Sequence, residues 1–145
     1  MEPEGVVDVL RRLLRALVPG GVVVDLTMAP PDEIVESRGE ILGQLDGSAF
    51  FPRAIAAGAG LDALAREGLL DLEREEPVTV IVRYPTGNDV LEDVAGRTYT
   101  AMPSALASRL ETISAECLLR SNCLVRTFRS SGSDPWGVTP VASAG

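Results

Sequence analysis

The sequence predicts an α/β or α+β protein, with roughly five or six strands in one mixed sheet and three or four helices packed on it. Some segments carry apolar side chains at helical spacing, and others are short runs rich in β-branched residues. The chain has 145 residues, 46% of them hydrophobic and 23% charged, which suits one globular domain. We expect this domain over residues 1–129. A flexible tail is expected over residues 130–145, which are rich in Ser, Gly, Pro and Ala.

The first two predicted elements are a helix over 6–18 and a strand over 22–27. Leucines and valines recur at helical spacing in the first segment, and Pro19-Gly20-Gly21 ends it. The second segment is apolar on both faces as far as Asp25. Such a run is typical of a strand that is covered on both sides, usually in a parallel sheet.

Two short strands over 34–37 and 41–45 are predicted to meet at Arg38-Gly39. A helix is predicted next, over 51–67, and Gly68 is well placed to end it. The residues expected on the inner face of this helix are Phe51, Ile55, Leu61, Leu64 and Ala65.

The remaining chain predicts three strands and two more helices. Strands over 69–75 and 78–84 are expected to break at Glu76-Pro77. Thr86 and Asp89 have the spacing of a capping box that opens a short helix ending near Ala95. A further helix is predicted to begin at Pro103, and its apolar stripe consists of Leu106, Leu110 and Ile113. The last predicted strand runs over 118–128 and could bend near Ser121-Asn122.

The charged residues exclude several classes of function. The net charge is -8, so the overall field repels nucleic acid and anionic lipid. All 13 basic residues are arginines, and the chain has no lysine or histidine. There is thus no histidine base, histidine metal ligand or Schiff-base lysine. We therefore expect no metal, and we assign no catalytic residue.

The expected location is the cytoplasm. No stretch approaches the ~18 apolar residues of a membrane span, and the N-terminus lacks the basic start of a signal peptide. In that compartment Cys117 and Cys123 are expected to be reduced thiols. A straight strand would hold them roughly 20 Å apart, too far for a disulfide, whereas a bend could bring them together.

Leu17-Val18-Pro19-Gly20-Gly21 ends a predicted helix and leads into a predicted strand. This order resembles the L-x-P-G-G segment and fifth strand of the family of class I S-adenosylmethionine-dependent methyltransferases. Residues 64–70 look like its last large helix, whose end carries a glycine and an apolar residue. Segments 69–75 and 78–84 would then be similar to its final antiparallel pair. The resemblance covers about half of the chain and implies a Rossmann-methyltransferase-like C-terminal half.

The resemblance implies no cofactor-binding residue in this chain. The family binds its cofactor on a Gly-rich loop after its first strand, with an acidic residue at the end of the second strand. Neither feature precedes Val6 here. We therefore expect the isolated chain to bind no S-adenosylmethionine and to need no cofactor.

Four residues are candidates for ligand binding. Asp25 lies near the end of an apolar strand, where α/β sheets gather ligands, although it could instead accept N–H bonds from the turn over 26–29. Arg83 and Arg126, on one side of a sheet, could bind carboxylates or phosphates. Tyr84 could join them, or lie at the edge of the core with its hydroxyl in water.

The alternative for the arginines, including Arg120, is ordinary ion pairing across strands. The acidic residues expected as partners are Asp71, Glu73 and Glu75.

Three functions remain open from the sequence. The first is a non-catalytic protein that acts through protein contact, as a homodimer or with another partner. The second is a methyltransferase fragment completed by another chain, and the third is a small-ligand-binding α+β module. Dimerisation is expected through the strand over 22–26, since an uncovered apolar strand invites pairing. Alternatively, the helix after Pro103 could fold over that strand and leave a monomer.

Overall fold

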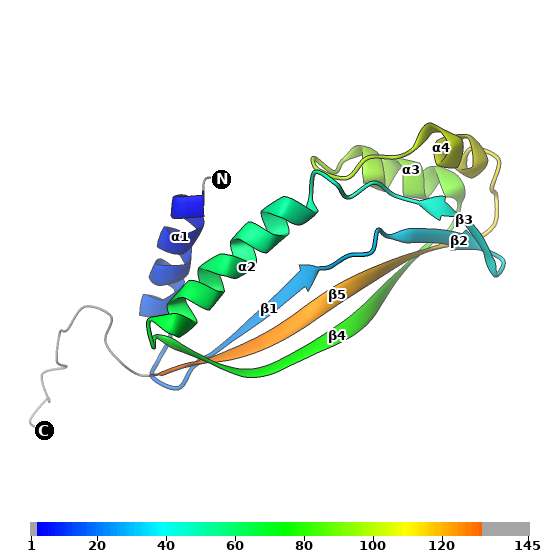
Figure 1. Ribbon diagram of the computed structural model, residues 1–145. Coiled ribbons are helices and arrows are strands. Elements are labelled where there is room, and N and C mark those ends of the chain that lie inside the picture. Colours follow the sequence, from blue (N-terminus) through cyan, green and yellow to red (C-terminus); the bar gives the residue numbers. More distant parts are fainter. Residues whose placement is uncertain (1–2, 132–145) are drawn as a thin grey trace, which may run out of the picture. The chain divides into compact units, whose positions relative to one another are not determined.

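A computed structural model describes residues 3–131 of the chain (Figure 1). Within these residues, five strands form one open antiparallel sheet and four helices accompany it, which confirms the predicted α/β or α+β class. The expected mixed sheet is corrected, because the strands pair antiparallel. The elements in chain order are α1 (Pro3–Ala16), β1 (Val22–Met28), β2 (Ile34–Ser37), β3 (Glu40–Gln44), α2 (Phe51–Arg66), β4 (Leu70–Tyr84), α3 (Gly87–Ala95), α4 (Ser104–Leu110) and β5 (Cys117–Ser130). The tail expected over 130–145 lies, from residue 132 onward, outside the described residues.

Strand β5 is the centre of the sheet. β1, β2 and β4 all pair with β5, and β3 pairs with β2. β2 runs antiparallel to β5, with Ile34 opposite Arg120 and Ser37 opposite Cys117. The backbone N–H of Ala29, next to β1, donates to the carbonyl of Asn122. The pairing along this edge of β5 therefore continues from β2 toward β1.

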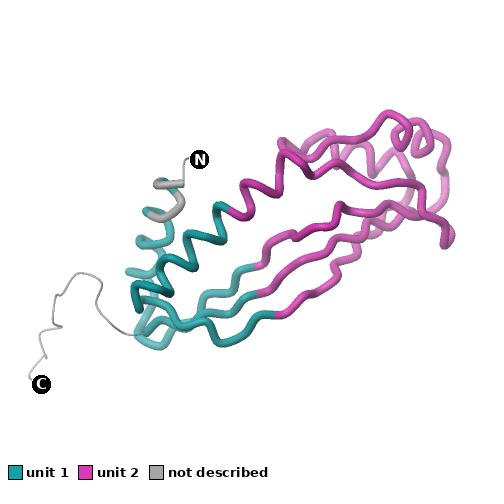
Figure 2. The backbone as a smooth tube through the Cα atoms, viewed as in Figure 1, with its two compact units in different colours: residues 1–25, 56–75, 126–145 teal, residues 26–55, 76–125 magenta. Residues whose placement is uncertain are grey.

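The chain divides into two compact units (Figure 2). Among the described residues, unit 1 consists of residues 3–25, 56–75 and 126–131, and unit 2 of residues 26–55 and 76–125. β1, α2, β4 and β5 each pass from one unit into the other along the chain. Each unit therefore takes segments that are far apart in the sequence.

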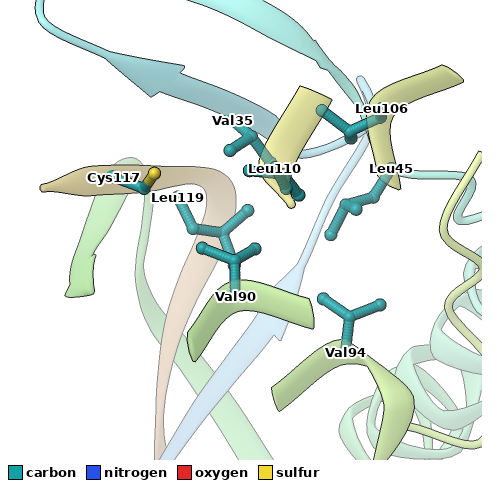
Figure 3. Packing of buried hydrophobic residues seen from close by; sticks show 8 residues of the cluster. All are labelled: Val35, Leu45, Val90, Val94, Leu106, Leu110, Cys117 and Leu119. Atoms are coloured by element: carbon teal, nitrogen blue, oxygen red, sulfur yellow. The ribbon is translucent and has the colours of Figure 1, made fainter. Parts of the chain in front are cut away.

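The core of unit 2 joins α3 and α4 to the strands (Figure 3). Val90 and Val94 of α3 and Leu110 of α4 are buried, and they pack with residues of β2 and β5. The full set of buried residues in this cluster is Val35, Leu45, Val90, Val94, Leu106, Leu110, Cys117 and Leu119. The helix after Pro103 thus packs into this core, and the outward side chains of β1 stay exposed. It does not close over β1, which corrects that alternative.

The core of unit 1 is smaller. Its buried residues are Leu61, Leu64, Leu70 and Phe128. Leu10 and Leu14 of α1 and Val23 of β1 pack against this cluster. Ile55, expected on the inner face of α2, is instead 68% exposed, so the helix buries its C-terminal half rather than its whole length.

Local signals ended the elements where the sequence indicated. Arg38 (φ 51°) and Gly39 (φ 78°) form the left-handed two-residue turn between β2 and β3. Gly68 (φ 76°) ends α2, where the N–H groups of Gly68 and Leu69 donate to the carbonyls of Ala65 and Leu64. Thr86 and Asp89 form the expected capping box at the start of α3.

Two strand predictions were wrong. The segments predicted as separate strands around Glu76-Pro77 are one continuous strand, β4. Because β4 pairs with β5 on one side only, the nitrogen of Pro77, which carries no hydrogen, can lie on the unpaired edge, where no hydrogen bond is lost. β1 is not covered on both sides of a parallel sheet. Its burial alternates, as expected for an antiparallel strand with one solvated face.

The last strand, β5, is continuous through both cysteines. Its buried positions alternate regularly from Cys117 to Cys123, with no interruption at Ser121-Asn122. The alternation shifts by one residue only between Cys123 and Arg126. Because β5 is one strand through both cysteines, the straight-strand alternative is the one that applies. Both cysteines are buried.

Candidate functional site

Two sequence-predicted site residues, Asp25 and Arg126, meet in unit 1. The Arg126 Nε and Nη2 atoms donate to Asp25 Oδ2 over 3.2 and 3.1 Å. Nη1 donates to Asp62 Oδ1 over 2.8 Å, and Nη2 also reaches the Gly58 carbonyl at 3.5 Å. The Arg126 side chain is only 9% exposed. Two carboxylates thus neutralise one buried guanidinium.

The local sequence explains how β1, α2 and β5 form this centre. Alternation along β1 turns Asp25 inward, between the outward Val24 and Leu26. Gly58 gives α2 room for the guanidinium, because a Cβ there would lie 3.2 Å from Arg126 Nη2. Arg126 also lies 5.2 Å from the ring centroid of Phe128, two residues along β5. These contacts use the donors of Arg126 within the protein, so we interpret the centre as a structural ion pair.

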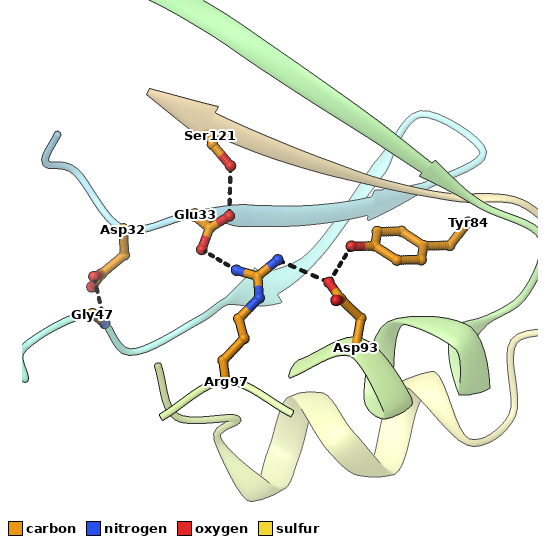
Figure 4. Close-up of polar contacts among 7 residues, drawn as sticks. All are labelled: Asp32, Glu33, Gly47, Tyr84, Asp93, Arg97 and Ser121. Atoms are coloured by element: carbon orange, nitrogen blue, oxygen red, sulfur yellow. Dashed lines mark hydrogen bonds and ion pairs between the residues drawn. The ribbon is translucent and has the colours of Figure 1, made fainter. Parts of the chain in front are cut away.

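A second polar cluster lies in unit 2 (Figure 4). Glu33 is buried and accepts from Arg97 Nη1 over 2.8 Å and from the Ser121 hydroxyl over 2.5 Å. Arg97 Nη2 donates to Asp93 Oδ2 over 2.9 Å. The hydroxyl of Tyr84 donates to the same oxygen over 2.5 Å. The result is one chain of hydrogen bonds from Ser121 to Tyr84.

The electrostatics of this cluster oppose proton transfer near neutral pH. Burial, followed by the hydrogen bond to Asp93, raises the pKa of Tyr84 to about 12. The hydrogen bond from Tyr84, helped by Arg97, lowers the pKa of Asp93. Tyr84 therefore stays protonated and Asp93 ionised across the physiological range. Among the described residues, no buried side-chain polar atom lacks a hydrogen-bond partner.

The remaining candidate, Arg83, lies apart from both clusters. Its Nη1 donates to Glu116 Oε1 over 2.9 Å, and both side chains are exposed. The four predicted site residues thus occupy three places. Arg126 and Asp25 form a buried pair, Tyr84 ends the Glu33 cluster, and Arg83 makes a surface ion pair.

The ion-pair alternative for the arginines is confirmed, although its partners differ from those expected. Arg120 donates to Glu36 of β2 over 2.7 Å, not to a residue of β4. Among the expected acidic residues, Glu73 of β4 pairs with Arg129, a residue that the sequence argument passed over. The hydrogen bond from Arg129 lowers the pKa of Glu73.

Sequence reasoning missed Glu33, Asp62, Asp93 and Arg97. Asp93 and Arg97 have the i,i+4 spacing of a helical ion pair, which could have indicated them. Nothing near Glu33 or Asp62 in the sequence distinguishes them from solvated carboxylates. Their roles depend on arginines 64 residues away along the chain.

Neither cysteine is an activated nucleophile. Burial raises the pKa of both Cys117 and Cys123, which favours the unreactive thiol over the thiolate. Within residues 3–131, no group of three or more Cys, Asp and Glu side chains is arranged to hold a metal ion. None of the helices in this range is long and apolar enough to cross a membrane.

One exposed apolar face lies on β1. Val22, Val24 and Leu26 alternate along its outward face and are 43%, 64% and 60% exposed. Val23, between them, packs into the core of unit 1.

The chain matches no known protein family, no curated protein sequence and no solved structure at a significant level. Function is therefore inferred from the contacts and surfaces of the chain itself.

Proposed function

We propose that this protein acts through protein contact, as a homodimer in which β1 of one copy pairs with β1 of a second. The exposure of Val22, Val24 and Leu26 on one strand is the observation that carries this proposal. Within residues 3–131, β5 is the only strand that pairs with β1, so the other edge of β1 is open. Unpaired N–H and C=O groups at such an edge can bind another strand.

A comparison of β1 with β4 supports this choice of strand. β4 also pairs only with β5 among the described strands, but it contains Pro77 and a run of charged residues over 73–76. Proline and charge are the usual means of protecting an edge from unwanted pairing. β1 has neither on its outward face, where the side chains are apolar. β1 is therefore the edge that favours association.

The sequence of β1 also suits pairing with itself. In an antiparallel pair centred on Asp25, Val24 of each copy would oppose Leu26 of the other, and Val22 would oppose Met28. Such apolar cross-strand pairs are stabilising, and a two-fold axis places the same residues on both sides. The Asp25 side chain points inward and is ion-paired with Arg126, which reduces repulsion between the two central carboxylates.

Light scattering on the purified chain tests the dimer. We expect a species of twice 15.3 kDa that Val24→Glu converts to the monomer, because an unpaired carboxylate in an apolar interface is unfavourable. Val24 is preferred to Val23, whose substitution would also damage the core of unit 1. Ile55→Glu is the matched control, since Ile55 is similarly exposed but lies on α2. A 15.3 kDa species at all concentrations would contradict the proposal.

The register has its own test. A variant with Val24→Cys and Leu26→Cys should form intermolecular disulfides, because positions 24 and 26 face each other across the two-fold axis. A matched variant with Val18→Cys and Val22→Cys should cross-link less, since its thiols would face no thiol of the partner. A dimer that cross-links equally through both pairs would exclude pairing centred on Asp25.

A further inference from the structure

A hollow of about 340 Å³ lies in unit 2, beside the turn between β2 and β3. One wall is the turn itself, with Arg38 and Glu40, and the other is the segment after α4, with Thr112 and Ser114. Leu42 and Ile113 add apolar side chains to the lining. The volume falls at the lower end of the range for small-molecule sites, which is roughly 300–1,000 Å³.

Arg38 differs from most arginines of the chain. Among residues 3–131 its guanidinium has no hydrogen bond, ion pair or ring contact. Arg66 is also without such a partner in this part of the chain, but it lies in the last turn of α2, where the helix dipole favours a cation. Arg38 is exposed to solvent, and it has no comparable contact with the described part of the protein.

The backbone at Arg38 is also unusual. Its φ of 51° lies in the left-handed region, where Asn, Asp and Gly are preferred in a hairpin turn. A long cationic side chain at this position is held at the expense of local stability. Strained residues of this kind often mark functional positions, and here the strained residue lines a hollow.

Glu40 supplies a matching negative charge on the other side of Gly39. Its carboxylate, like the guanidinium of Arg38, has no hydrogen-bond or ion-pair partner among the described residues. The two side chains are both exposed and form no ion pair with each other. The hollow has one available cation, one available anion and an apolar surface.

We propose that this hollow binds a free α-amino acid with an aliphatic side chain. The guanidinium of Arg38 would hold the carboxylate through paired N–H donors, and Glu40 would accept from the ammonium group. Leu42 and Ile113 would contact the aliphatic side chain. A simple anion would be repelled by Glu40 and by the net charge of -8, and a simple cation would be repelled by Arg38.

Calorimetric titration with leucine tests the site, together with leucinamide, which lacks the carboxylate, and N-acetyl-leucine, which lacks the ammonium group. We expect leucine to bind one site per chain and each derivative to bind at least about tenfold more weakly, because each loses a charge-assisted contact. Equal binding of leucinamide or N-acetyl-leucine, or no binding of leucine in the millimolar range, would overturn the proposal. Tighter binding of inorganic phosphate than of leucine would do so as well.

Two variants assign the charges. Arg38→Asn should abolish the preference for leucine over leucinamide, and it should fold well because Asn tolerates positive φ. Glu40→Gln should abolish the preference for leucine over N-acetyl-leucine. The matched controls, Arg66→Gln and Glu92→Gln, remove the same charges elsewhere and should leave both preferences intact. If the controls change them as much as the site variants do, the overall field rather than the hollow controls binding, and the proposal fails.

Discussion

Unit 1 buries an arginine, whereas unit 2 buries a glutamate, and each neutralises that charge with its own residues. Arg126 is held by Asp25 and Asp62, and Glu33 by Arg97 and Ser121. The surroundings of the two buried charges differ. The Asp62 side chain is about half exposed, whereas the partners of Glu33 continue into Asp93 and Tyr84. The unit with the smaller apolar core thus also has the shorter polar network.

This difference indicates how each unit should respond when its charge is removed. In unit 1, one guanidinium neutralises two carboxylates, so its loss leaves two like charges near each other. In unit 2, Arg97 forms ion pairs with both Glu33 and Asp93, so it keeps the ion pair with Asp93 when Glu33 is changed. A buried ion pair is costly to break when one charge is left uncompensated.

The largest effect is expected for Arg126→Met. We expect the free energy of unfolding to fall by about 3–5 kcal/mol, the usual range for breaking a buried pair. Glu33→Gln should cost less, about 1–3 kcal/mol, because it leaves hydrogen-bonding capacity in place. Urea unfolding measures both. Arg66→Met, at an arginine without a side-chain partner in residues 3–131, should change stability by less than about 0.5 kcal/mol. A larger loss for Glu33→Gln than for Arg126→Met would reverse the comparison.

The thiols show whether the two units unfold together. Cys117 and Cys123 both belong to unit 2, and both are buried. Four elements run through both units, so we expect Arg126→Met, in unit 1, to speed alkylation of these thiols by about a hundredfold or more. Mass spectrometry should count two labels in denaturant without reductant. Unchanged labelling in the variant would mean that unit 2 keeps its structure when unit 1 opens.

The next effect compares two glycines, one in each unit. A Cβ at Gly87, in unit 2, would lie 2.0 Å from the Leu110 carbonyl oxygen, so Gly87→Ala must displace backbone. We expect a loss of about 1–3 kcal/mol in urea unfolding. Gly58→Ala, in unit 1, meets only the guanidinium of Arg126, and it gains helix propensity. Its effect should stay within about 1 kcal/mol, and a loss matching that of Gly87→Ala would show that Arg126 is as rigid as backbone.

The smallest effect is a pH dependence that belongs to unit 2. Because folding raises the pKa of Tyr84 to about 12, the folded state holds this proton more tightly than the unfolded state does. Its contribution to stability is fully present below about pH 10 and is lost as the pH rises toward 12. Absorbance of tyrosinate should show a transition near pH 12 that Tyr84→Phe removes. The variant should also lose less stability over that interval, and an unchanged transition would assign it elsewhere.

Most helix and turn boundaries could be predicted from the sequence because their signals are local. The capping box joins residues three apart, and the end of α2 requires only that Gly68 adopt a positive φ. The two-residue turn at Arg38-Gly39 likewise depends on its own backbone. Side-chain hydrogen bonds and glycine freedom act within one turn of the chain, so a short window of sequence contains the necessary information.

The contents of the candidate sites could not be predicted in the same way. Asp25 and Arg126 were both selected as candidates, but their pairing joins residues 101 apart in the chain. Ser121 and Glu33 are 88 apart, and nothing adjacent to Glu33 indicates that it is buried. The ion pairs expected between Arg120 or Arg126 and β4 formed with other carboxylates, because any one of many acidic residues could satisfy them.

The sequence by itself determined the fold class, the helix ends, the hairpin turn and the exclusion of histidine and lysine chemistry. The tertiary structure decided that Pro77 lies within one long strand, since only an edge position tolerates its missing N–H. It also decided that β1 has one solvated apolar face, because antiparallel pairing with β5 leaves the outward side chains uncovered. Strand neighbours and charge partners are chosen by the folded chain as a whole, and hydrophobic pattern alone cannot specify them.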